Sequence, residues 1–513
     1  MISKNTLLLL CVSIPSFMIN LDANIVAVSL TSIAHSLHAD FAAIEWVISG
    51  YTLAFAILLM PAGALADRFG RKRMLLIGLA LFTVASGICG AASTSLVLNA
   101  ARVLQGAGAA LQLSAALAIL AHGFHGAARA KAFAFWGSVI GIATTLGPVV
   151  GGLITQSLGW QWAFYINLPI GCVMIALVLR TVTDSKDPNA NKIDTAGVVT
   201  LSAGLGLLTS ALIAGNRDGW SSLPIILQLA GSAVFFIAFL VVELKQKRPM
   251  VELHYFLRPT YLGATIAGVA YAVSFLTLLT YLPLFFQSGL GKSPLIAGLL
   301  MLPLAIPLFI MPRVVSSYLD YHLSGRTLLS SGLILVGIGA FFTALHIREF
   351  QYLSVLWSMM IASVGAGILN GQTAKVGMSV IPVERAGMAS GIAGTMRFSG
   401  VVVGFAALGA ILYERISIIV SRDLPMTTDM EKGQIIHSIV NGNLQAAKAF
   451  ISAHQGLSSV ASDSLGFAYQ GVFFMSSLVA LVAGAAVWLL VKSHETAPIA
   501  VGMPQHREEI PLD

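Results

Sequence analysis

The sequence contains little charge. Only 10% of its 513 residues are Asp, Glu, Lys or Arg, whereas 57% are hydrophobic, and the mean hydropathy is +0.86. A soluble globular chain carries roughly 25% charged residues, because most of its surface meets water. This composition excludes a soluble protein of such length and predicts a protein that crosses a membrane many times.

Cysteines and catalytic motifs are also scarce. The three cysteines, Cys11, Cys89 and Cys172, fall within apolar runs, so we expect small hydrophobic residues and not a disulfide framework or a metal site. The sequence has no G-x-x-x-x-G-K-[ST] phosphate loop, no G-x-S-x-G elbow and no H-E-x-x-H zinc motif. We therefore expect neither an enzyme nor an ATP-driven motor, and no cofactor or metal.

The net charge of +7 does not indicate a nucleic-acid partner. Nucleic-acid binding needs cations gathered on one face, and here Lys and Arg are dispersed among short loops between apolar runs. The lipid bilayer is the predicted surrounding of the chain.

Fourteen apolar runs come close to the length of about 20 residues that a spanning helix needs. The first run follows Lys4 as a signal peptide would, but it is too long for one and contains Asn20 and Asp22, so we count it as a helix. The runs lie at about 6–30, 43–66, 74–95, 97–121, 131–155, 161–182, 195–214, 222–244, 260–286, 294–315, 325–346, 351–378, 387–412 and 467–491.

The basic residues predict the orientation. With the N-terminus inside, most of the 29 Lys and Arg residues fall in cytoplasmic segments, as the positive-inside rule requires. We therefore predict a protein of the cell (inner) membrane with both termini in the cytoplasm. The polar tail at 493–513 is expected to be disordered, and the one long outer segment, 413–466, is expected to hold short helices.

A short basic stretch joins the second and third runs. It reads G-A-L-A-D-R-F-G-R-K-R over residues 63–73, with an acid at a helix end. Its two glycines, Gly63 and Gly70, are expected to let the two helix ends come close and to let the chain reverse. The order of glycine, acid and base closely resembles the signature loop between helices 2 and 3 of the major facilitator superfamily. The alternative is a loop that only sets topology. The resemblance implies a conformational gate formed by Gly63, Asp67, Arg68, Gly70 and Arg71.

The fifth run carries a stripe of small residues on one helix face, and it ends in G-P-V-V-G-G at 147–152. The proline should kink the helix, and the glycines should flatten its surface for close contact with another helix. The segment resembles the motif that marks antiporters within the superfamily; the alternative is tight packing alone. The residues concerned are Gly137, Gly141, Gly147, Pro148, Gly151 and Gly152.

An eroded copy of the basic loop follows the tenth run, from Ser317 to Asp320 and on to Gly325 and Arg326. It predicts two six-helix halves, as in the parallel repeats of major facilitator transporters. The fold class is thus an all-α membrane protein with two six-helix halves plus two inserted central helices. The expected divisions are 1–182, 183–258 for the inserted pair, and 259–492.

Fourteen helices with a central insertion resemble the fourteen-span drug:proton antiporter family. The resemblance implies proton-coupled export of amphipathic, often cationic, small molecules, that is, multidrug efflux. The alternatives are a dedicated exporter of one metabolite, such as a siderophore or sugar, and a non-transporting sensor with the same fold. Family members in bacteria with two membranes often work with a periplasmic adaptor and an outer-membrane channel, so such partners stay open.

Two charged residues lie deep in the first half, within motifs that resemble the family's helix 1 and helix 4 patterns. At about 1.5 Å per residue, Asp22 lies about 12 Å and Arg102 about 8 Å below the outer face. We predict that they pair and couple transport to protons. Glu45, near the outer start of the second run, is the rival proton carrier. The alternatives are a structural acid and an arginine that reaches to the interface.

Polar residues within runs predict the wall of a substrate cavity. Lys375 belongs either to this wall or to the cytoplasmic interface, and Phe285 and Phe286 face either substrate or lipid. The aromatic stretch 159–171, which resembles the opening of the family's helix 6, is expected to be structural. The predicted cavity residues are Asn20, Gln105, Asn370, Gln372 and Arg397.

Overall fold

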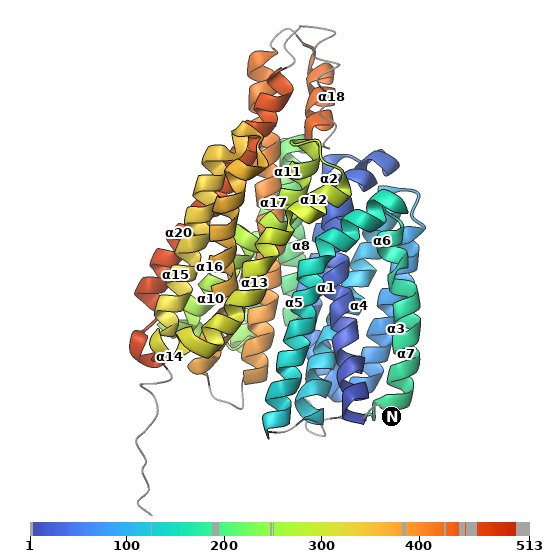
Figure 1. The fold of residues 1–513 in the computed structure, drawn as a ribbon, viewed down its shortest axis with the longest axis vertical. Coiled ribbons are helices and arrows are strands. Elements are labelled where there is room, and N and C mark those ends of the chain that lie inside the picture. Colours follow the sequence, from blue (N-terminus) through green and yellow to red (C-terminus); the bar gives the residue numbers. More distant parts are fainter. Residues whose placement is uncertain are drawn as a thin grey trace, which may run out of the picture.

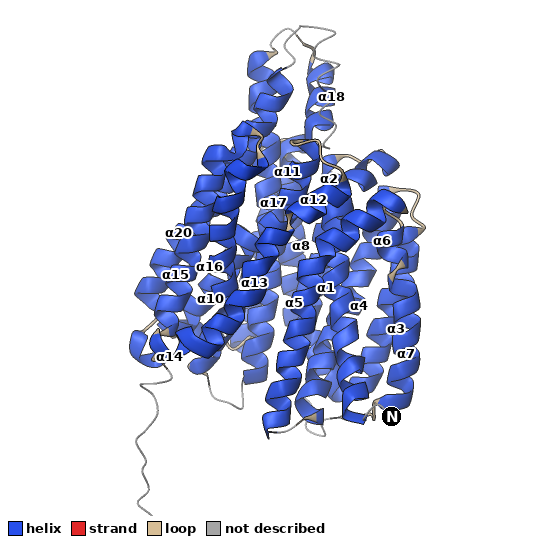
Figure 2. Ribbon diagram, viewed as in Figure 1, coloured by secondary structure: helices blue, strands red, loops and turns tan. Residues whose placement is uncertain are grey.

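The computed structural model describes residues 4–124, 126–186, 194–246, 249, 251–381, 386–424, 427–440, 447 and 459–498. Within these ranges the regular structure is helical and no strand occurs, as Figure 2 shows. Fourteen helices are long and apolar enough to cross a membrane. The predicted all-α membrane fold with fourteen spans is confirmed.

The first half consists of six spans that run up and down the bundle (Figure 1). The sixth span combines a single turn, α6, with the longer α7. The helices are α1 (Lys4–Leu37), α2 (Phe41–Phe69), α3 (Arg71–Gly90), α4 (Ser95–Gly123), α5 (Gly126–Ser157), α6 (Trp162–Tyr165) and α7 (Asn167–Thr181).

The inserted pair follows, and then the second half. The pair is α8 (Thr195–Asp218) and α9 (Leu223–Lys245). Several spans of the second half are broken by π or 3₁₀ turns. The second half comprises η1 (Leu253–Leu257), α10 (Pro259–Tyr271), η2 (Ala272–Leu276), α11 (Leu278–Ser288), α12 (Pro294–Leu300), α13 (Leu302–Val314), η3 (Val315–Leu319), α14 (Asp320–His322), α15 (Gly325–His346), η4 (Ile347–Glu349), α16 (Tyr352–Ser379), α17 (Ala386–Asp423), α18 (Asp429–Val440), α20 (Ser459–Leu490) and η6 (Ser493–Thr496).

The two ends of the bundle are named here by what they carry. The basic end holds the turn at 63–73 and the first described residue, and the α18 end lies opposite (Figure 1). Helices extend further into the predicted outer segment 413–466 than expected, because α17 continues to Asp423 and α20 begins at Ser459. Residues 441–446 and 448–458 of that segment, and 499–513 of the predicted tail, lie outside the described residues.

The two halves share one apolar core at the α18 end. Buried side chains such as Ile25 of α1 and Phe285 of α11 belong to the same cluster. Toward the basic end each half also has a cluster of its own: Leu75 lies among first-half residues alone, and Leu333 among second-half residues alone. There the halves still touch along α2 and α17, where Met60 packs in one cluster with Ile392. The shared core is therefore largest at the α18 end.

Glycines set the close helix contacts within each half. A Cβ atom at Gly78 of α3 would lie 2.9 Å from the carbonyl oxygen of Gly108 of α4. In the second half, a Cβ atom at Gly332 of α15 would lie 3.1 Å from the carbonyl oxygen of Gly365 of α16. Small residues at such sites let helix backbones approach in a membrane. The same contact at corresponding places agrees with the predicted repeat.

The predicted contact of Phe285 and Phe286 with lipid or substrate is wrong for this conformation. Both side chains are 0% exposed and belong to the shared core. The next residue, Gln287, joins the halves: its Nε2 donates to the Val28 carbonyl oxygen at 2.9 Å, and its Oε1 accepts from the Thr31 hydroxyl at 2.5 Å. These side chains hold the α18 end closed.

Candidate functional site

The basic turn contains an ion pair, and its chain reversal has a glycine with positive φ. Arg71 donates through Nη2 and Nε to one oxygen of Asp67, at 2.9 and 3.1 Å. Gly70 has φ +111°, a conformation that residues with a Cβ atom rarely adopt. An added Cβ would also lie 2.5 Å from the carboxylate of Asp184, just beyond α7. Position 70 therefore needs glycine for two reasons.

The turn is anchored to the end of its own half. Arg73 pairs with Asp184 at 3.3 Å, and the Lys72 ammonium donates to the Leu179 carbonyl oxygen at 2.8 Å. Arg68 is exposed and lies over the ring of Phe69. These contacts all stay within the first half.

Gly63 is not a site of close approach in this conformation. A Cβ atom added there would meet no atom within 4 Å. The expectation that Gly63 brings two helix ends together is therefore not met here.

The eroded copy of the turn forms an ion pair of its own. Asp320 accepts from the Lys375 ammonium at 2.6 Å and from the Gln372 amide at 3.0 Å. Lys375 thus has a carboxylate partner, and this pairing leaves both of its predicted positions open. Gln372 is buried against Asp320 in this conformation.

The predicted pair of Asp22 and Arg102 is present and fully buried. Arg102 Nη1 lies 2.6 Å from Asp22 Oδ2, and the two side chains are 1% and 0% exposed. Asp22 Oδ1 accepts from the amides of Gln105 at 2.9 Å and Asn167 at 3.0 Å. Gln105 therefore belongs to this cluster and not to a cavity wall.

The arginine of this cluster is satisfied as well. Its Nε donates to the Val47 carbonyl oxygen at 2.9 Å, and its Nη1 donates to Gln105 Oε1 at 2.7 Å. The guanidinium carbon lies 4.1 Å from the ring centroid of Tyr51, a cation–π contact. Pairing together with hydrogen bonds is what makes a buried ion pair tolerable. All these partners come from the first half.

Asn167 is the member of the cluster that sequence reasoning missed. It opens α7 within the stretch 159–171, which was assigned a structural role only. An amide inside an apolar run is itself a signal, because an unsatisfied amide in a membrane is costly. The sequence therefore indicated that Asn167 needs a polar partner, but it did not show which helix supplies that partner.

Glu45 differs from Asp22 in position and in bonding. It lies near the start of α2, is 1% exposed, and its Oε1 has no hydrogen-bond partner. Its neighbours come from the second half: a Cβ atom at Gly409 of α17 would collide with Oε1, and would lie 2.9 Å from the Tyr281 hydroxyl of α11. Glu45 therefore sits at the boundary between the halves, at their closed end.

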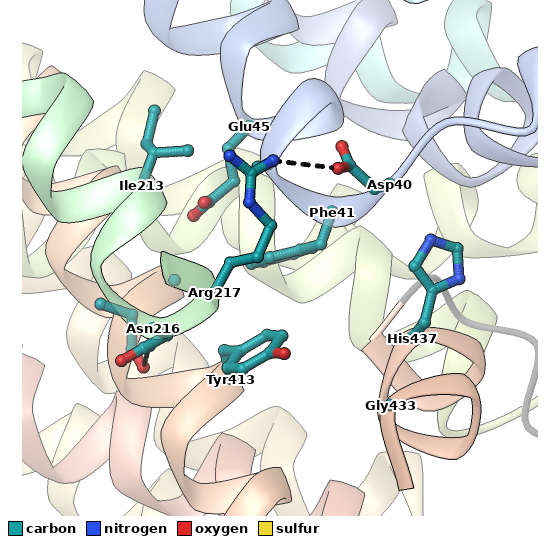
Figure 3. A pocket seen from close by; sticks show the side chains of 12 residues that line it. Asp40, Phe41, Glu45, Ile213, Asn216, Arg217, Tyr413, Gly433 and His437 are labelled. Carbon is teal, nitrogen blue, oxygen red and sulfur yellow. Dashed lines mark hydrogen bonds and ion pairs between the residues drawn. The ribbon is translucent and has the colours of Figure 1, made fainter. Parts of the chain in front are cut away.

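A cavity of about 140 Å³ adjoins Glu45. Figure 3 shows Glu45, Arg217 and Tyr413 around the same space, with Arg217 paired to Asp40. Four elements contribute: the start of α2, the end of α8, α17 and α18. The lining residues are Asp40, Phe41, Ala42, Glu45, Ile213, Asn216, Arg217, Gly409, Ala410, Tyr413, Gly433 and His437.

The glycines of the predicted antiporter motif divide into two groups. Toward the α18 end, Cβ atoms at Gly147, Gly151 and Gly152 would clash with neighbouring helices, Gly147 with Asn24 of α1 and Gly152 with the start of α12. Pro148 contributes a carbonyl oxygen that leaves no room for a Cβ atom at residue 298.

Toward the basic end the same helix is loosely packed. A Cβ at Gly141 would lie 3.5 Å from Phe309 of α13, and one at Gly137 would meet no atom within 4 Å. The stripe of small residues thus closes α5 against α1 and α12 at one end only. This matches the position of the shared core, which is largest at the α18 end.

Two predicted cavity residues, Asn20 and Asn370, differ in their local structure. Asn20 donates to the Ser16 carbonyl oxygen of its own helix at 2.8 Å. Asn370 and Gly371 interrupt α16 with non-helical dihedrals, and both are exposed. Non-helical backbone at membrane depth is tolerated where it lines water or is buried in protein, so the exposed kink is expected to face water.

Arg397 faces the interface between the halves. On α17, Gly394 and Phe398 contact α2, and Gly400 contacts η2, whereas α8 lies on another side. At 100° per residue, Arg397 lies between the first two faces. Its guanidinium carbon is 5.1 Å from the Tyr271 ring, and its Nε is buried without a hydrogen-bond partner.

Comparison with known proteins decides the family. The model of the Major Facilitator Superfamily matches residues 12–405. The chain belongs to the major facilitator superfamily. The resemblance predicted from the 63–73 turn is thereby confirmed, and the protein is a membrane transporter and not an enzyme.

The similar curated proteins include drug exporters. The chain is 35% identical to the multidrug resistance protein Stp of Mycobacterium tuberculosis over 409 residues, which cover 79% of this chain and 75% of that one. It is 30% identical to the tetracenomycin C resistance and export protein of Streptomyces glaucescens over 506 residues, covering 97% and 94%.

Solved structures of the superfamily share the fold. A peptide transporter, POT, in complex with sulfate matches with a TM-score of 0.65 at 13% identity, covering 97% of this chain and 100% of that one. A D-xylose–proton symporter matches with a TM-score of 0.61 at 16% identity, covering 96% and 99%.

The Asp22 cluster makes a prediction about stability. Replacing Asp22 by Ala leaves Arg102 charged, buried and unpaired, which should cost about 3–5 kcal/mol of unfolding free energy. The matched control is Asp67→Ala, which breaks a pair whose carboxylate is 40% exposed and should cost no more than about 1 kcal/mol. Thermal unfolding in detergent measures both. Equal melting of the two variants would contradict the structural importance of the buried pair.

Proposed function

We propose that this transporter exports amphipathic small molecules, cationic ones among them, in exchange for protons. The names of its relatives support drug export, and a transporter without a nucleotide-binding motif must draw on an ion gradient. We place it in the cell (inner) membrane with the basic end in the cytoplasm, because the 63–73 turn and its cations lie there.

A transport assay tests this function directly. The purified protein in proteoliposomes should move drug cations against their gradient when the α18 side is made acidic. Movement of a single metabolite only would instead identify a dedicated exporter. If no compound moves under any gradient, the chain is a sensor that keeps the fold.

The observation that carries the proton assignment is the unpartnered Oε1 of Glu45. A buried carboxylate without a cation or donor is expensive in an apolar bundle, so in this conformation Glu45 carries its proton. Its neighbours Gly409 and Tyr281 belong to the other half. When the halves part at the α18 end, Glu45 is exposed and exchanges the proton. Conformation and protonation are thereby linked.

Asp22 and Arg102 have a different part in this scheme. Their pair is satisfied within the first half and excluded from water, so it positions α1, α4 and α7 as one body. Proton exchange at Asp22 would require this cluster to open. We therefore assign the exchanging proton to Glu45 and a positioning role to Asp22 and Arg102.

The proton assignment predicts distinct outcomes for two variants. Glu45→Gln should abolish uphill export driven by a pH gradient and leave drug–drug counterflow intact, because counterflow needs no net proton transfer. Asp22→Asn should lower both activities together with stability. Proteoliposome flux measurements at equal reconstitution compare them. Uphill export with an unchanged proton requirement in Glu45→Gln would move the proton site elsewhere.

We propose that the basic turn and the antiporter stripe are the gate. In this conformation the stripe closes the α18 end, and Asp67, Arg68 and Arg71 stand free of the second half at the basic end. In the opposite conformation the basic ends meet, and Arg68, which is exposed here, gains a partner across the interface.

The gate predicts a kinetic effect at Asp67. Asp67→Asn removes the carboxylate that orients Arg71, so it should lower the export rate while the protein stays folded and inserted. Export at equal expression measures this, with Asp423→Asn as the control for loss of an exposed acid that pairs with its neighbour Arg422. Wild-type export rates in Asp67→Asn would favour a turn that only sets topology.

We propose that Arg397, Asn370 and Asn20 line the substrate path. Arg397 is a charged group at the interface of the halves, and among the described residues it has no carboxylate partner; in a membrane such a residue commonly contacts substrate or water. Arg397→Ala should weaken drug binding to the purified protein, as measured by equilibrium dialysis. The control is Arg422→Ala, near the end of α17, whose guanidinium is exposed and paired with its neighbour Asp423. Equal affinity for wild type and Arg397→Ala would remove Arg397 from the substrate path.

A further inference from the structure

The inserted pair covers the seam between the two halves beside Glu45. The end of α8 bonds to both sides: the Asn216 amide donates to the Ala410 carbonyl oxygen of α17, and Arg217 pairs with Asp40 before α2. Trp220 donates to Asn216 Oδ1 at 2.6 Å and fixes that amide. Helix α8 therefore forms the side wall of the cavity that adjoins Glu45.

The cavity has the size of a water site. Liquid water occupies about 30 Å³ per molecule, so a cavity of about 140 Å³ holds a few waters. Pockets that hold drug-sized molecules measure about 300–1,000 Å³. We infer that in this conformation the cavity holds water and not a drug-sized molecule.

Polar groups mark the way from Glu45 to the α18 end. Tyr281 of α11 lies beside the carboxyl group, and Tyr413 of α17 lines the cavity. Arg217 of α8 and His437 of α18 are the cationic or titratable groups toward the solution. Together with Asp40, these are the titratable and charged groups that surround the cavity and Glu45.

Two lining residues that reach the solution, Arg217 and Asp40, form a weak ion pair, and we call this exposed side of the cavity its mouth. Arg217 Nη1 lies 3.4 Å from Asp40 Oδ2, and the two side chains are 56% and 42% exposed. Exposed pairs of this kind contribute about 0–1 kcal/mol, so the pair opens easily. Both residues also have other partners: Arg217 bonds to Asp218, and Asp40 caps α2 through the amide of Ala43. Opening the pair therefore leaves both residues solvated and bonded.

We propose that this cavity is the route by which protons pass between the solution at the α18 end and Glu45 as the halves begin to part there, with α8 of the inserted pair as its wall and the Arg217–Asp40 pair across its mouth. The step is a proton transfer through water: the Glu45 carboxylate gains the proton that a hydronium ion loses. This inference rests on the proposed function of Glu45 as the proton carrier.

Filling the cavity tests the route. Ile213 of α8 lines it and is 6% exposed, so Ile213→Trp should displace its water. We expect export driven by a pH gradient to fall by about tenfold or more, a barrier increase of about 1.4 kcal/mol, while drug–drug counterflow persists. The matched control is Val199→Trp, which adds the same ring on the outside of α8, where Val199 is 61% exposed. Unchanged proton-driven export in Ile213→Trp would overturn the route.

A second variant is needed because Ile213→Trp could disturb the fold, so that both proton-driven export and counterflow fall. Arg217→Ala removes the pair at the mouth and should speed proton exchange at Glu45. Infrared spectroscopy after a pH jump follows the protonated carboxyl band that is missing in Glu45→Gln. An unchanged exchange rate in Arg217→Ala would overturn the proposal.

The two proposals fail in different ways. If Glu45→Gln itself keeps proton-driven export, the assignment of the proton to Glu45 fails. If Glu45→Gln loses it, but Ile213→Trp keeps proton-driven export or Arg217→Ala keeps the wild-type exchange rate, only the route fails.

Discussion

Charge inside an apolar bundle must be paired or neutral, and this constraint organises the whole structure. The buried Asp22–Arg102 pair meets it, because the carboxylate accepts from Gln105 and Asn167 and the guanidinium donates to Asp22, to Gln105 and to a backbone carbonyl. A pair of this kind locks the helices that supply its members. It therefore makes the first half a rigid body that can move as one piece.

The second half follows the same rule with different residues. Asp320, Lys375 and Gln372 form its own charged cluster, also between helices of one half. The groups without such partners, Glu45 and Arg397, lie instead where the halves face each other. Paired charges thus lie within the halves, and unpartnered groups lie between them. This arrangement suits alternating access, because only the interface changes when two rigid halves rock against each other.

The inserted pair belongs to this interface. Helix α8 contacts α2 on one side and α17 on the other, and its last turn bonds to both halves at the closed end. A pair of helices that only lengthened the chain would need no such polar bonds, because lipid-facing contacts are satisfied by apolar side chains. The inserted pair is thus part of the interface between the halves, where α8 lines the cavity beside Glu45.

The sequence by itself determined the spans, the family and the depth of each charge. A run of about 20 apolar residues is stable in few places other than a membrane, and a helix rise of about 1.5 Å fixes how deep Asp22 and Arg102 lie, so their pairing was predictable. Tertiary structure decided which helices adjoin. It placed Gln105 and Gln372 in charged clusters, and it set Glu45 against Gly409 of a distant helix. Sequence spacing gives depth along a helix, whereas the neighbour across it depends on how small residues let whole helices pack.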